Sequence, residues 1–368
     1  MNKSKINYFN IPYEEQLAMK QAFVKRIFQS ERVEAITANP KPMYYRHKVT
    51  LSAVMQNNKL RLGQYEENTK TIKPKINHAV QDEMINLVFG SIEKLLNKYK
   101  LKAYNPKIKQ GIIKHVMIRK SFAYGQYLIV FVTQGNLFPN HQKLIKELVA
   151  LHPEIVSVVQ NIHFRDTPIV LLSNEKVLYG TGYIYDQIDD YRFRMSARSF
   201  YQVNPKQMIN LYKKALLLAD IKTNEIVCDA YCGIGTMTLL ASPYAKEVIG
   251  IDVSKSSIED AIYNKQYNQV GNVDFIHDDV EKWLQKAKVK VDCLIMDPTR
   301  HGATEIFLKS VLKLEPKRIV YVSCDIETQK RDIDVLLEKY RIDSINPFDM
   351  FSYTDHVETI TLLSLKTA

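Results

Sequence analysis

The sequence lacks any long apolar run. No stretch approaches the roughly 18 consecutive apolar residues that a membrane-spanning helix needs. Its first ten residues, MNKSKINYFN, also lack the apolar core of a secretory signal peptide. We therefore expect a cytoplasmic protein that does not insert into a membrane.

Cysteine is scarce and confined to one half of the chain. Among 368 residues there are four cysteines, and none lies in the first 227 positions. Cys228 and Cys232 are separated by three residues, whereas zinc sites commonly separate two cysteines by two. Neither a disulfide framework nor a complete metal site is indicated, so we expect no bound metal. At least one cysteine of Cys228, Cys232, Cys293 and Cys324 is then free for chemistry.

Glycine and proline, at 12 and 13 residues, are too few for a disordered or collagen-like chain, and no repeat is visible. Acidic residues are outnumbered: 51 Lys and Arg face 40 Asp and Glu, a net charge of +11. This excess favours a polyanionic partner such as RNA, although lysines on solvated helix faces can produce it alone. The length predicts two domains.

Hydrophobic periodicity predicts a helix and then an α+β domain in the first half of the chain. The helix covers residues 12–29. Further helices are predicted at 81–100 and 141–153, and strands at 44–54, 59–66, 114–121, 126–135, 167–173, 177–188 and 191–196.

The second half alternates strand, loop and helix, which is typical of a doubly wound, Rossmann-like α/β sheet. Helices are predicted at 236–242 and 257–268, and strands at 225–231, 247–253, 273–279, 291–298, 318–324 and 356–365. Ligands of such sheets bind at the carboxyl ends of the strands. Those ends carry most of the residues discussed next.

The loop after the first of these strands reads DAYCGIGT, with Gly233 and Gly235 where the backbone turns sharply. The third glycine of a dinucleotide site is replaced by Thr238, which disfavours a pyrophosphate and favours S-adenosylmethionine. Asp252 and Asp279 end the next two strands and suit the ribose hydroxyls and the adenine amino group. Turn residues of these types are common, and a nicotinamide-dependent oxidoreductase remains a competitor at this point.

Cys324 directly follows the strand RIVYV, and several motifs surround it. In order they are SFYQVNPKQ, DAYCGIGT, DPTRHG, YVSCDIETQKRDIDVL and DMFSYTDHVETITLL. Together they resemble the motifs of the RNA 5-methyluridine (uracil-C5) methyltransferase family over roughly the last 190 residues. Members of that family methylate uridines in transfer RNA or large-subunit ribosomal RNA.

The resemblance implies a role for each matching position. It implies that Cys324 is the nucleophile and Glu358 the general base. The implied cofactor-binding residues are Gln202, Tyr231, Gly233, Gly235, Thr236, Asp252, Asp279 and Asp297. The implied substrate-binding residues are Arg300, Met350, Phe351 and His356. Alternation along HVETITL further predicts that His356 and Glu358 share one face of a strand.

The chain departs from the family pattern at Thr299, His301 and Asp325, and an acid beside the thiol disfavours the thiolate. Tyr13, Gln16 and Lys20 resemble a segment that follows the iron–sulfur cysteines of cluster-bearing relatives. With no cysteine nearby, we expect a short form with neither the cluster nor an amino-terminal β-barrel (TRAM) module. RNA contacts are then expected from a set in the middle of the chain: Tyr45, Arg46, Lys48, Lys107, Lys109, Lys114, Arg119 and Lys120.

We predict three parts: an N-terminal helical segment at 1–40, an α+β RNA-binding domain at 41–180, and an S-adenosylmethionine-dependent catalytic domain at 181–368. The protein is expected to act as a monomer on 23S ribosomal RNA, with uridine 54 of transfer RNA as the alternative. A non-catalytic RNA-binding or assembly protein is a further alternative, which the retention of Cys324 and Glu358 disfavours. Cytosine-C5 methylation is disfavoured because Ser323, and not proline, precedes the cysteine.

Overall fold

The computed structural model of the protein describes residues 7–66 and 69–366. The chain divides into two compact units: unit 1 comprises Met1–Pro42 and Phe200–Ala368, and unit 2 comprises Met43–Ser199. In the described ranges, no helix is both long and apolar enough to cross a membrane.

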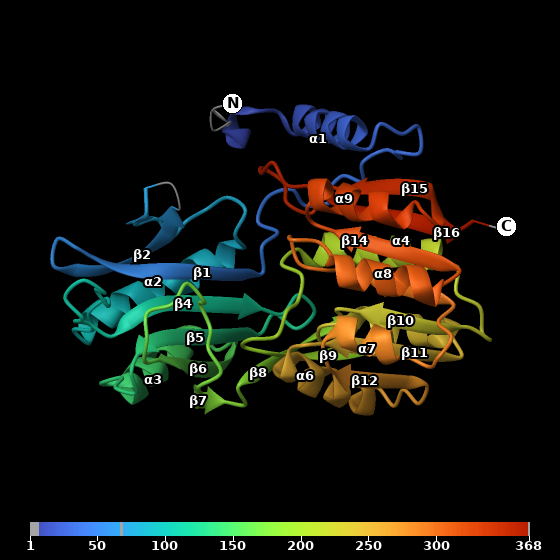
Figure 1. The fold of residues 1–368 in the computed structure, drawn as a ribbon. Coiled ribbons are helices and arrows are strands. Elements are labelled where there is room, and N and C mark those ends of the chain that lie inside the picture. Colours follow the sequence, from blue (N-terminus) through green and yellow to red (C-terminus); the bar gives the residue numbers. More distant parts are fainter. Residues whose placement is uncertain (1–6, 67–68, 367–368) are drawn as a thin grey trace. The chain divides into compact units, whose positions relative to one another are not determined.

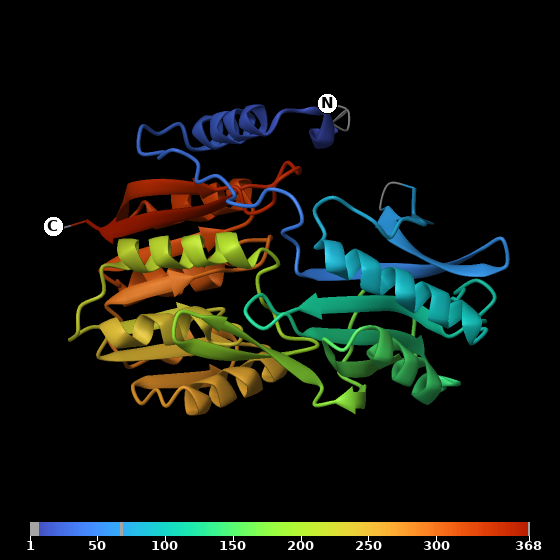
Figure 2. The same ribbon diagram turned by 180° about the vertical axis from the view of Figure 1, so that it is seen from behind.

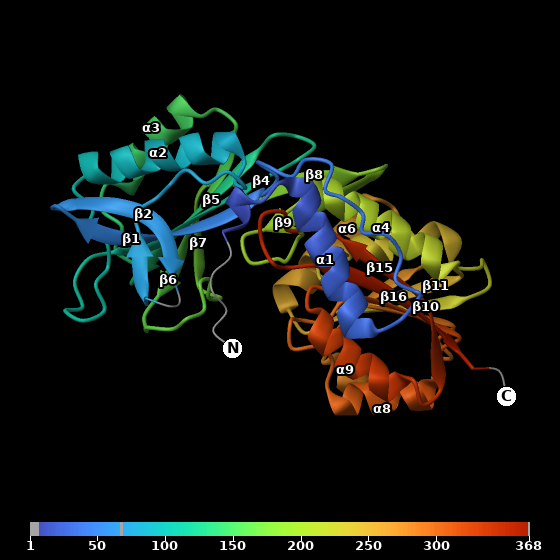
Figure 3. The same cartoon turned by 90° about the horizontal axis from the view of Figure 1, so that it is seen from above.

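Unit 2 is an α+β domain built on a seven-stranded sheet in the order β3-β2-β1-β4-β5-β6-β7. Helices α2 and α3 lie on one face of this sheet (Figure 3) and bury their apolar sides against it. Asp82 begins α2 by accepting the backbone N–H of Met84, at 3.1 Å. The elements are β1 (Lys48–Gln56), β2 (Lys59–Glu66), β3 (Thr71–Lys73), α2 (Glu83–Lys98), β4 (Ile113–Lys120), β5 (Tyr127–Gln134), α3 (His141–Leu151), β6 (Ile155–His163), β7 (Glu175–Gly180), β8 (Tyr183–Ile188) and β9 (Tyr191–Ser196).

Two strand predictions in unit 2 need correction. The strand predicted at 167–173 does not form, and these residues lie in a partly exposed loop interrupted by Pro168, which has no N–H to donate. The strand predicted at 177–188 is split into β7 and β8 around Thr181 and Gly182. The buried strand β6, which pairs in parallel with β5, was not predicted because its apolar run lacks alternation.

Unit 1 contains the Rossmann-like sheet, in the order β12-β11-β10-β13-β14-β16-β15. Strands β10 to β14 are parallel, and β16 runs antiparallel to both β14 and β15. Helices α8 and α4 cover opposite faces (Figures 1 and 2). The elements are α1 (Tyr13–Phe28), α4 (Pro205–Ala219), β10 (Ile226–Ala230), α5 (Thr236–Ala241), β11 (Glu247–Asp252), α6 (Lys255–Tyr267), β12 (Val273–His277), α7 (Val280–Lys286), β13 (Cys293–Met296), α8 (Glu305–Leu314), β14 (Arg318–Ser323), α9 (Ile326–Leu336), β15 (Tyr340–Phe348) and β16 (Glu358–Leu365).

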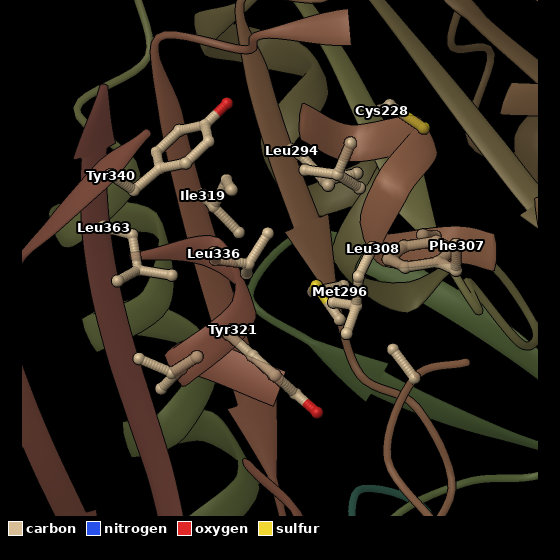
Figure 4. Close-up of a cluster of buried hydrophobic side chains, with 14 of the residues drawn as sticks. Cys228, Leu294, Met296, Phe307, Leu308, Ile319, Tyr321, Leu336, Tyr340 and Leu363 are labelled. Atoms are coloured by element: carbon tan, nitrogen blue, oxygen red, sulfur yellow. The ribbon is translucent and has the colours of Figure 1, made fainter. Parts of the chain in front are cut away.

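The core of unit 1 fills the space between this sheet and the helices that cover it. Figure 4 shows Leu294, Ile319 and Leu363 on neighbouring strands, close to Phe307 of α8 and Leu336 of α9. All five side chains are completely buried, which stabilises the sheet by about 1.5–3 kcal/mol for each. The strands whose carboxyl ends are expected to bind ligands are therefore anchored in a well-packed core.

The N-terminal segment is part of unit 1. Helix α1 lies beside α9 (Figures 1 and 3), and the chain after it runs along the edge strand β15. Glu34 N–H donates to Ile345 at 2.8 Å, and Thr37 N–H donates to Pro347 at 2.8 Å. Residues 1–6 of the segment predicted at 1–40 lie outside the described residues, and the rest of that segment joins the sheet that carries the catalytic motifs.

The boundary predicted after residue 180 also differs from the structure, since unit 2 extends to Ser199. Buried Asp186 of β8 explains the difference. It accepts N–H groups from Phe122 and Ala123, at 3.1 and 2.8 Å, and so ties the β8–β9 hairpin to unit 2.

Gly235 offers a test of the fold. A Cβ there would lie 2.3 Å from Cζ of Phe275, at a φ of +80°. Gly235→Ala should therefore destabilise unit 1 by about 3 kcal/mol through overpacking and backbone strain. Gly271→Ala, whose Cβ would meet nothing within 4 Å, should change stability by less than about 0.5 kcal/mol. Urea unfolding of both variants measures this, and equal stabilities would contradict it.

Candidate active site

A cavity opens at the carboxyl ends of β10, β13 and β14, where the strand order of the sheet reverses. This is the position at which open α/β sheets bind ligands. Four predicted cofactor residues line it, namely Tyr231, Gly233, Thr236 and Asp297. The other lining residues are Phe200, Tyr201, Tyr212, Asp229, Cys232, Ile234, Met237, Ile295 and Val322.

The two glycines of the DAYCGIGT loop have different tasks. Gly233 has a φ of +57° and open space where a side chain would be, so a ligand can approach its backbone. Gly235 lies against Phe275 and is required by packing within the protein. Asp252 does not line the cavity, but its carboxylate accepts N–H groups from Gly233 and Ser254, at 2.9 and 2.7 Å. Asp252 therefore fixes the shape of the loop.

The cavity suits a cation. Its lining includes the carboxyls of Asp229 and Asp297 and no Lys, Arg or His. Burial raises the pKa of each carboxyl to about 7, and the charge of Asp229 contributes at Asp297. A positive sulfonium group beside them would favour their ionised forms, and tyrosine rings also attract cations. A pyrophosphate would be repelled here, which argues against the nicotinamide alternative.

The remaining predicted cofactor residues lie outside the cavity lining. Asp279 is the N-cap of α7 and accepts the N–H of Glu281 at 2.9 Å. Gln202 is 6% exposed and follows Phe200 and Tyr201, which do line the cavity. Sequence reasoning missed these two aromatic residues, although they belong to the SFYQVNPKQ motif.

Cys324 and Glu358 lie next to the last residue pair of β14 and β16. In this antiparallel pair Ser323 faces Thr359, Cys324 follows Ser323, and Glu358 precedes Thr359. The charge of Glu358 also raises the pKa of Cys324, so the two groups are near each other. Thr359 is held in place because its hydroxyl donates to Gln329 of α9, at 2.5 Å. A thiol and a carboxyl therefore meet at the ligand-binding edge of the sheet.

The thiol of Cys324 is neutral at rest. Burial, followed by the charges of Glu358 and Asp297, raises its pKa to about 11, while the neighbouring Arg300 opposes the rise through its charge and a hydrogen bond. Cys324 is nevertheless the one partly exposed thiol, because Cys228, Cys232 and Cys293 are buried. Arg300 is the cation that would stabilise the thiolate.

Asp325 does not face the thiol as a competing charge. Its carboxylate is the N-cap of α9, accepting the N–H of Thr328 at 3.0 Å and the hydroxyl of the same residue at 3.2 Å. This departure from the family pattern therefore has a structural role in starting a helix.

Glu358 is buried, with 1% of its surface exposed, and its Oε2 has no hydrogen-bond partner in the described part of the chain. Burial and the nearby charge of Asp297 raise the pKa of Glu358 well above its usual range, while Arg300 lowers it. A buried carboxyl oxygen without a hydrogen bond is costly unless a ligand uses it. Asp297 lines the cavity and its charge acts on Glu358, so the two are connected electrostatically.

The segment between β15 and β16 carries three of the predicted substrate residues. Met350 is fully buried, and its contact with the SFYQVNPKQ motif is through its carbonyl oxygen, which accepts from Asn204 at 3.0 Å. Phe351 is half-buried and meets His356 edge to face, with ring centroids 6.1 Å apart. His356 precedes β16, so the strand alternation predicted for His356 and Glu358 does not apply.

No group of three or more His, Cys, Asp or Glu side chains in residues 7–66 and 69–366 is arranged to hold a metal ion.

The fold and its cation-accepting cavity define an S-adenosylmethionine-dependent methyltransferase. Comparison with known proteins gives the family, since the family model described as tRNA (Uracil-5-)-methyltransferase matches residues 12–366. This chain belongs to that RNA uracil-5 methyltransferase family, and its activity is RNA (uracil-5-) methylation.

Individual relatives agree. An uncharacterized RNA methyltransferase of Oceanobacillus iheyensis is 38% identical over 368 residues, covering 97% of this chain and 80% of that protein. One from Staphylococcus aureus is 34% identical over 367 residues, covering 97% and 81%. Among solved structures, the Pyrococcus abyssi tRNA (uracil-54, C5)-methyltransferase in complex with S-adenosyl-L-homocysteine has a TM-score of 0.79 and 25% identity, covering 96% of this chain and 83% of that one.

The cavity carboxyls predict how cofactor affinity depends on pH. With a pKa of about 7, Asp229 and Asp297 must lose protons to face a cation. Each proton released gives up to about tenfold per pH unit, so the affinity for S-adenosylmethionine should rise by up to about a hundredfold per pH unit below pH 7 and level off above it. The unliganded protein should lose stability over the same rise in pH.

Isothermal titration at pH 5.5 to 8.5 measures this dependence. Asp297→Asn should reduce the slope of the rise by about half, since Asp229 still titrates, while the exposed control Asp274→Asn should keep the full slope. An affinity of the wild type that is constant over this range would contradict the assignment of the cavity to a cation.

Proposed function

We propose that the protein methylates carbon 5 of a uridine in large-subunit (23S) ribosomal RNA, with Cys324 as covalent nucleophile and Glu358 as general base. The observation that carries this proposal is that the partly exposed thiol of Cys324 and the buried carboxyl of Glu358 flank the last pair of β14 and β16, Ser323 and Thr359, and interact electrostatically. Asp297 links the pair electrostatically to the cofactor cavity.

The nucleophile is needed because carbon 5 of uracil is too weak to take a methyl group from a sulfonium by itself. The thiolate of Cys324 adds to carbon 6, forming an S–C6 bond and moving the C5=C6 electron pair into an enolate that ends at O4. The thiol first loses its proton to solvent, and Arg300 stabilises the resulting thiolate. Bound S-adenosylmethionine supplies the methyl group, which carbon 5 takes as the S–CH3 bond breaks.

The second half of the reaction needs a base. Glu358 takes the proton from carbon 5, the C5=C6 bond forms again, and the S–C6 bond breaks with its electron pair returning to Cys324. Burial and the charge of Asp297 raise the pKa of Glu358, which favours its protonated form in the empty site. A positive charge beside Asp297 lowers the pKa of both carboxyls and prepares Glu358 to act as the base.

Unit 2 is proposed to bind the RNA, through fewer of the predicted side chains than expected. Arg119 is 3% exposed and donates to the Ser199 carbonyl oxygen, and Lys120 is paired with Asp82 at 2.8 Å. Tyr45 is buried, and Lys114 is paired with Asp166 at 3.1 Å. The exposed loop at 105–110 keeps Lys107 and Lys109 available for phosphate contacts.

Ribosomal RNA is proposed because SFYQVNPKQ and DAYCGIGT resemble the ribosomal members of the family. Both motifs contribute residues to the cavity lining, whereas an accessory barrel can be replaced by basic residues that contact phosphates. Transfer RNA is the second candidate, favoured by the similarity to the Pyrococcus abyssi enzyme.

The substrate test uses purified protein and labelled S-adenosylmethionine. We expect label in unmodified 23S ribosomal RNA, recovered as 5-methyluridine, and only background in unmodified transfer RNA. Several salt concentrations are needed because binding through phosphates weakens steeply with salt. Label confined to the T-loop of transfer RNA would overturn the ribosomal proposal and leave the chemistry intact.

A further inference from the structure

Tyr13, Gln16 and Lys20 take no part in the chemistry described above, yet all three face the active-site loop. Positions i, i+3 and i+7 of a helix share one face, and in α1 this face lies against residues 349–353. That loop joins β15 to the base Glu358 and contains Phe351.

Lys20 and Asp349 form a buried ion pair. The Lys20 Nζ atom lies 2.5 Å from Oδ1 of Asp349, and the side chains are 3% and 0% exposed. The other oxygen of Asp349 accepts the hydroxyls of Tyr13, at 2.7 Å, and Ser352, at 2.5 Å. Lys20 also donates to the carbonyl oxygen of Phe351, at 3.0 Å. Every one of these bonds constrains the start of the loop.

Gln16, one turn before Lys20 in α1, binds the middle of the loop. The buried Gln16 accepts the N–H of Tyr353, at 3.1 Å, and donates to the carbonyl oxygens of Tyr8 and Ile11, both at 2.9 Å. The ring of Tyr353 stacks on Phe9 at 4.8 Å between centroids. The loop is therefore bonded to α1 at both Phe351 and Tyr353.

The loop that α1 holds is adjacent to the strand pair that contains the proposed base Glu358. Phe348, the residue before Asp349, is the cross-strand partner of Glu358. A displacement of Asp349 would therefore be transmitted to the β15–β16 pairing at Glu358, and to Phe351 on the same loop. A shift of about 1 Å in a reacting group can cost about a hundredfold in rate.

We propose that Tyr13, Gln16 and Lys20 are positioning residues, which hold the loop at 349–353 so that Phe351 and Glu358 meet the flipped uracil in the reactive geometry. This inference rests on the proposed function. A buried ion pair suits the task because its bonds are directional, and apolar contacts of the same size would hold the loop without fixing its register.

The test compares Lys20→Met with Lys25→Met, a control at an exposed position on the same helix. Lys20→Met should lower kcat for RNA methylation about ten- to a hundredfold at saturating substrates, while the Kd for S-adenosylmethionine changes less than about twofold. Formation of the covalent adduct with RNA containing 5-fluorouridine should slow in parallel. Lys25→Met should match the wild type in all three measurements.

Two further variants separate positioning from stability. Lys20→Met combined with Asp349→Leu removes both charges, so the melting temperature should recover while kcat does not. If Lys20→Met does not fold, Tyr13→Phe, which deletes one hydroxyl, should lower kcat by a smaller factor at an unchanged melting temperature.

The inference is overturned if Lys20→Met and Tyr13→Phe keep kcat within about twofold of the wild type, or if the double variant recovers kcat together with stability. The proposed function fails separately, if the wild type forms neither 5-methyluridine nor a 5-fluorouridine adduct.

Discussion

Cys324→Ala should bind S-adenosylmethionine with wild-type affinity and lose methyl transfer by at least about three orders of magnitude. The physical reason is that carbon 5 is activated by addition of a thiolate to carbon 6, and Cys324 is the partly exposed thiol at this edge, whereas Cys232 in the cavity lining is buried. The lining of the cofactor cavity does not include Cys324, so cofactor binding should be preserved. Label transfer to RNA and isothermal titration measure the two quantities.

The matched control is Cys293→Ala. This thiol is completely buried in β13, and replacing it should lower stability slightly and leave the methylation rate within about threefold. Methylation by the Cys324→Ala variant at more than background would show that the reaction does not pass through this thiol.

Glu358→Gln should trap the reaction half way. The amide keeps the shape of the side chain but cannot take the carbon 5 proton, so addition and methyl transfer proceed while elimination stalls. Turnover should fall about 10²- to 10⁴-fold, and an RNA–protein adduct should accumulate with ordinary uridine RNA. Denaturing gel electrophoresis shows this adduct as a slowly migrating band that contains both RNA and protein.

Glu338→Gln is the control, because Glu338 is exposed and lies between α9 and β15. It should turn over normally and give no adduct. If Glu358→Gln instead turned over at the wild-type rate, the carboxyl would have a structural role and another group would take the proton.

The parallel part of the unit 1 sheet was predictable because β10, β13 and β14 are apolar runs that end at a motif, and β11 and β12 each lead to an aspartate at or just after the strand end. Strand β15 was not predicted. It is an edge strand that mixes polar residues with Pro347 and contains an irregularity between Ile342 and Ser344, so its sequence shows neither a continuous apolar run nor a clean alternation. The bonding of the N-terminal segment to β15 depends on backbone groups, which leave no signal in the side chains.

The site residues that belong to sequence motifs could be predicted. Those that only the packing of the chain brings to the site could not. Asp229 and Tyr212 reach the cavity from β10 and α4, and only the packing of unit 1 brings Tyr212 there. The hydrogen bond from Arg119 to the carbonyl oxygen of Ser199 likewise depends on the tertiary fold and cannot be read from the sequence. Sequence reasoning found the polar residues but could not tell which of them face a ligand and which bind their own chain.

The most direct test of the central claim locates the covalent bond. The wild-type protein is incubated with S-adenosylmethionine and RNA containing 5-fluorouridine, from which the base cannot remove fluorine as it removes a proton, and the adduct is digested and sequenced by tandem mass spectrometry. We predict a methylated 5-fluorouridine attached to the sulfur of Cys324. Attachment to any other residue, or no adduct under conditions in which ordinary uridine RNA is methylated, would contradict the account.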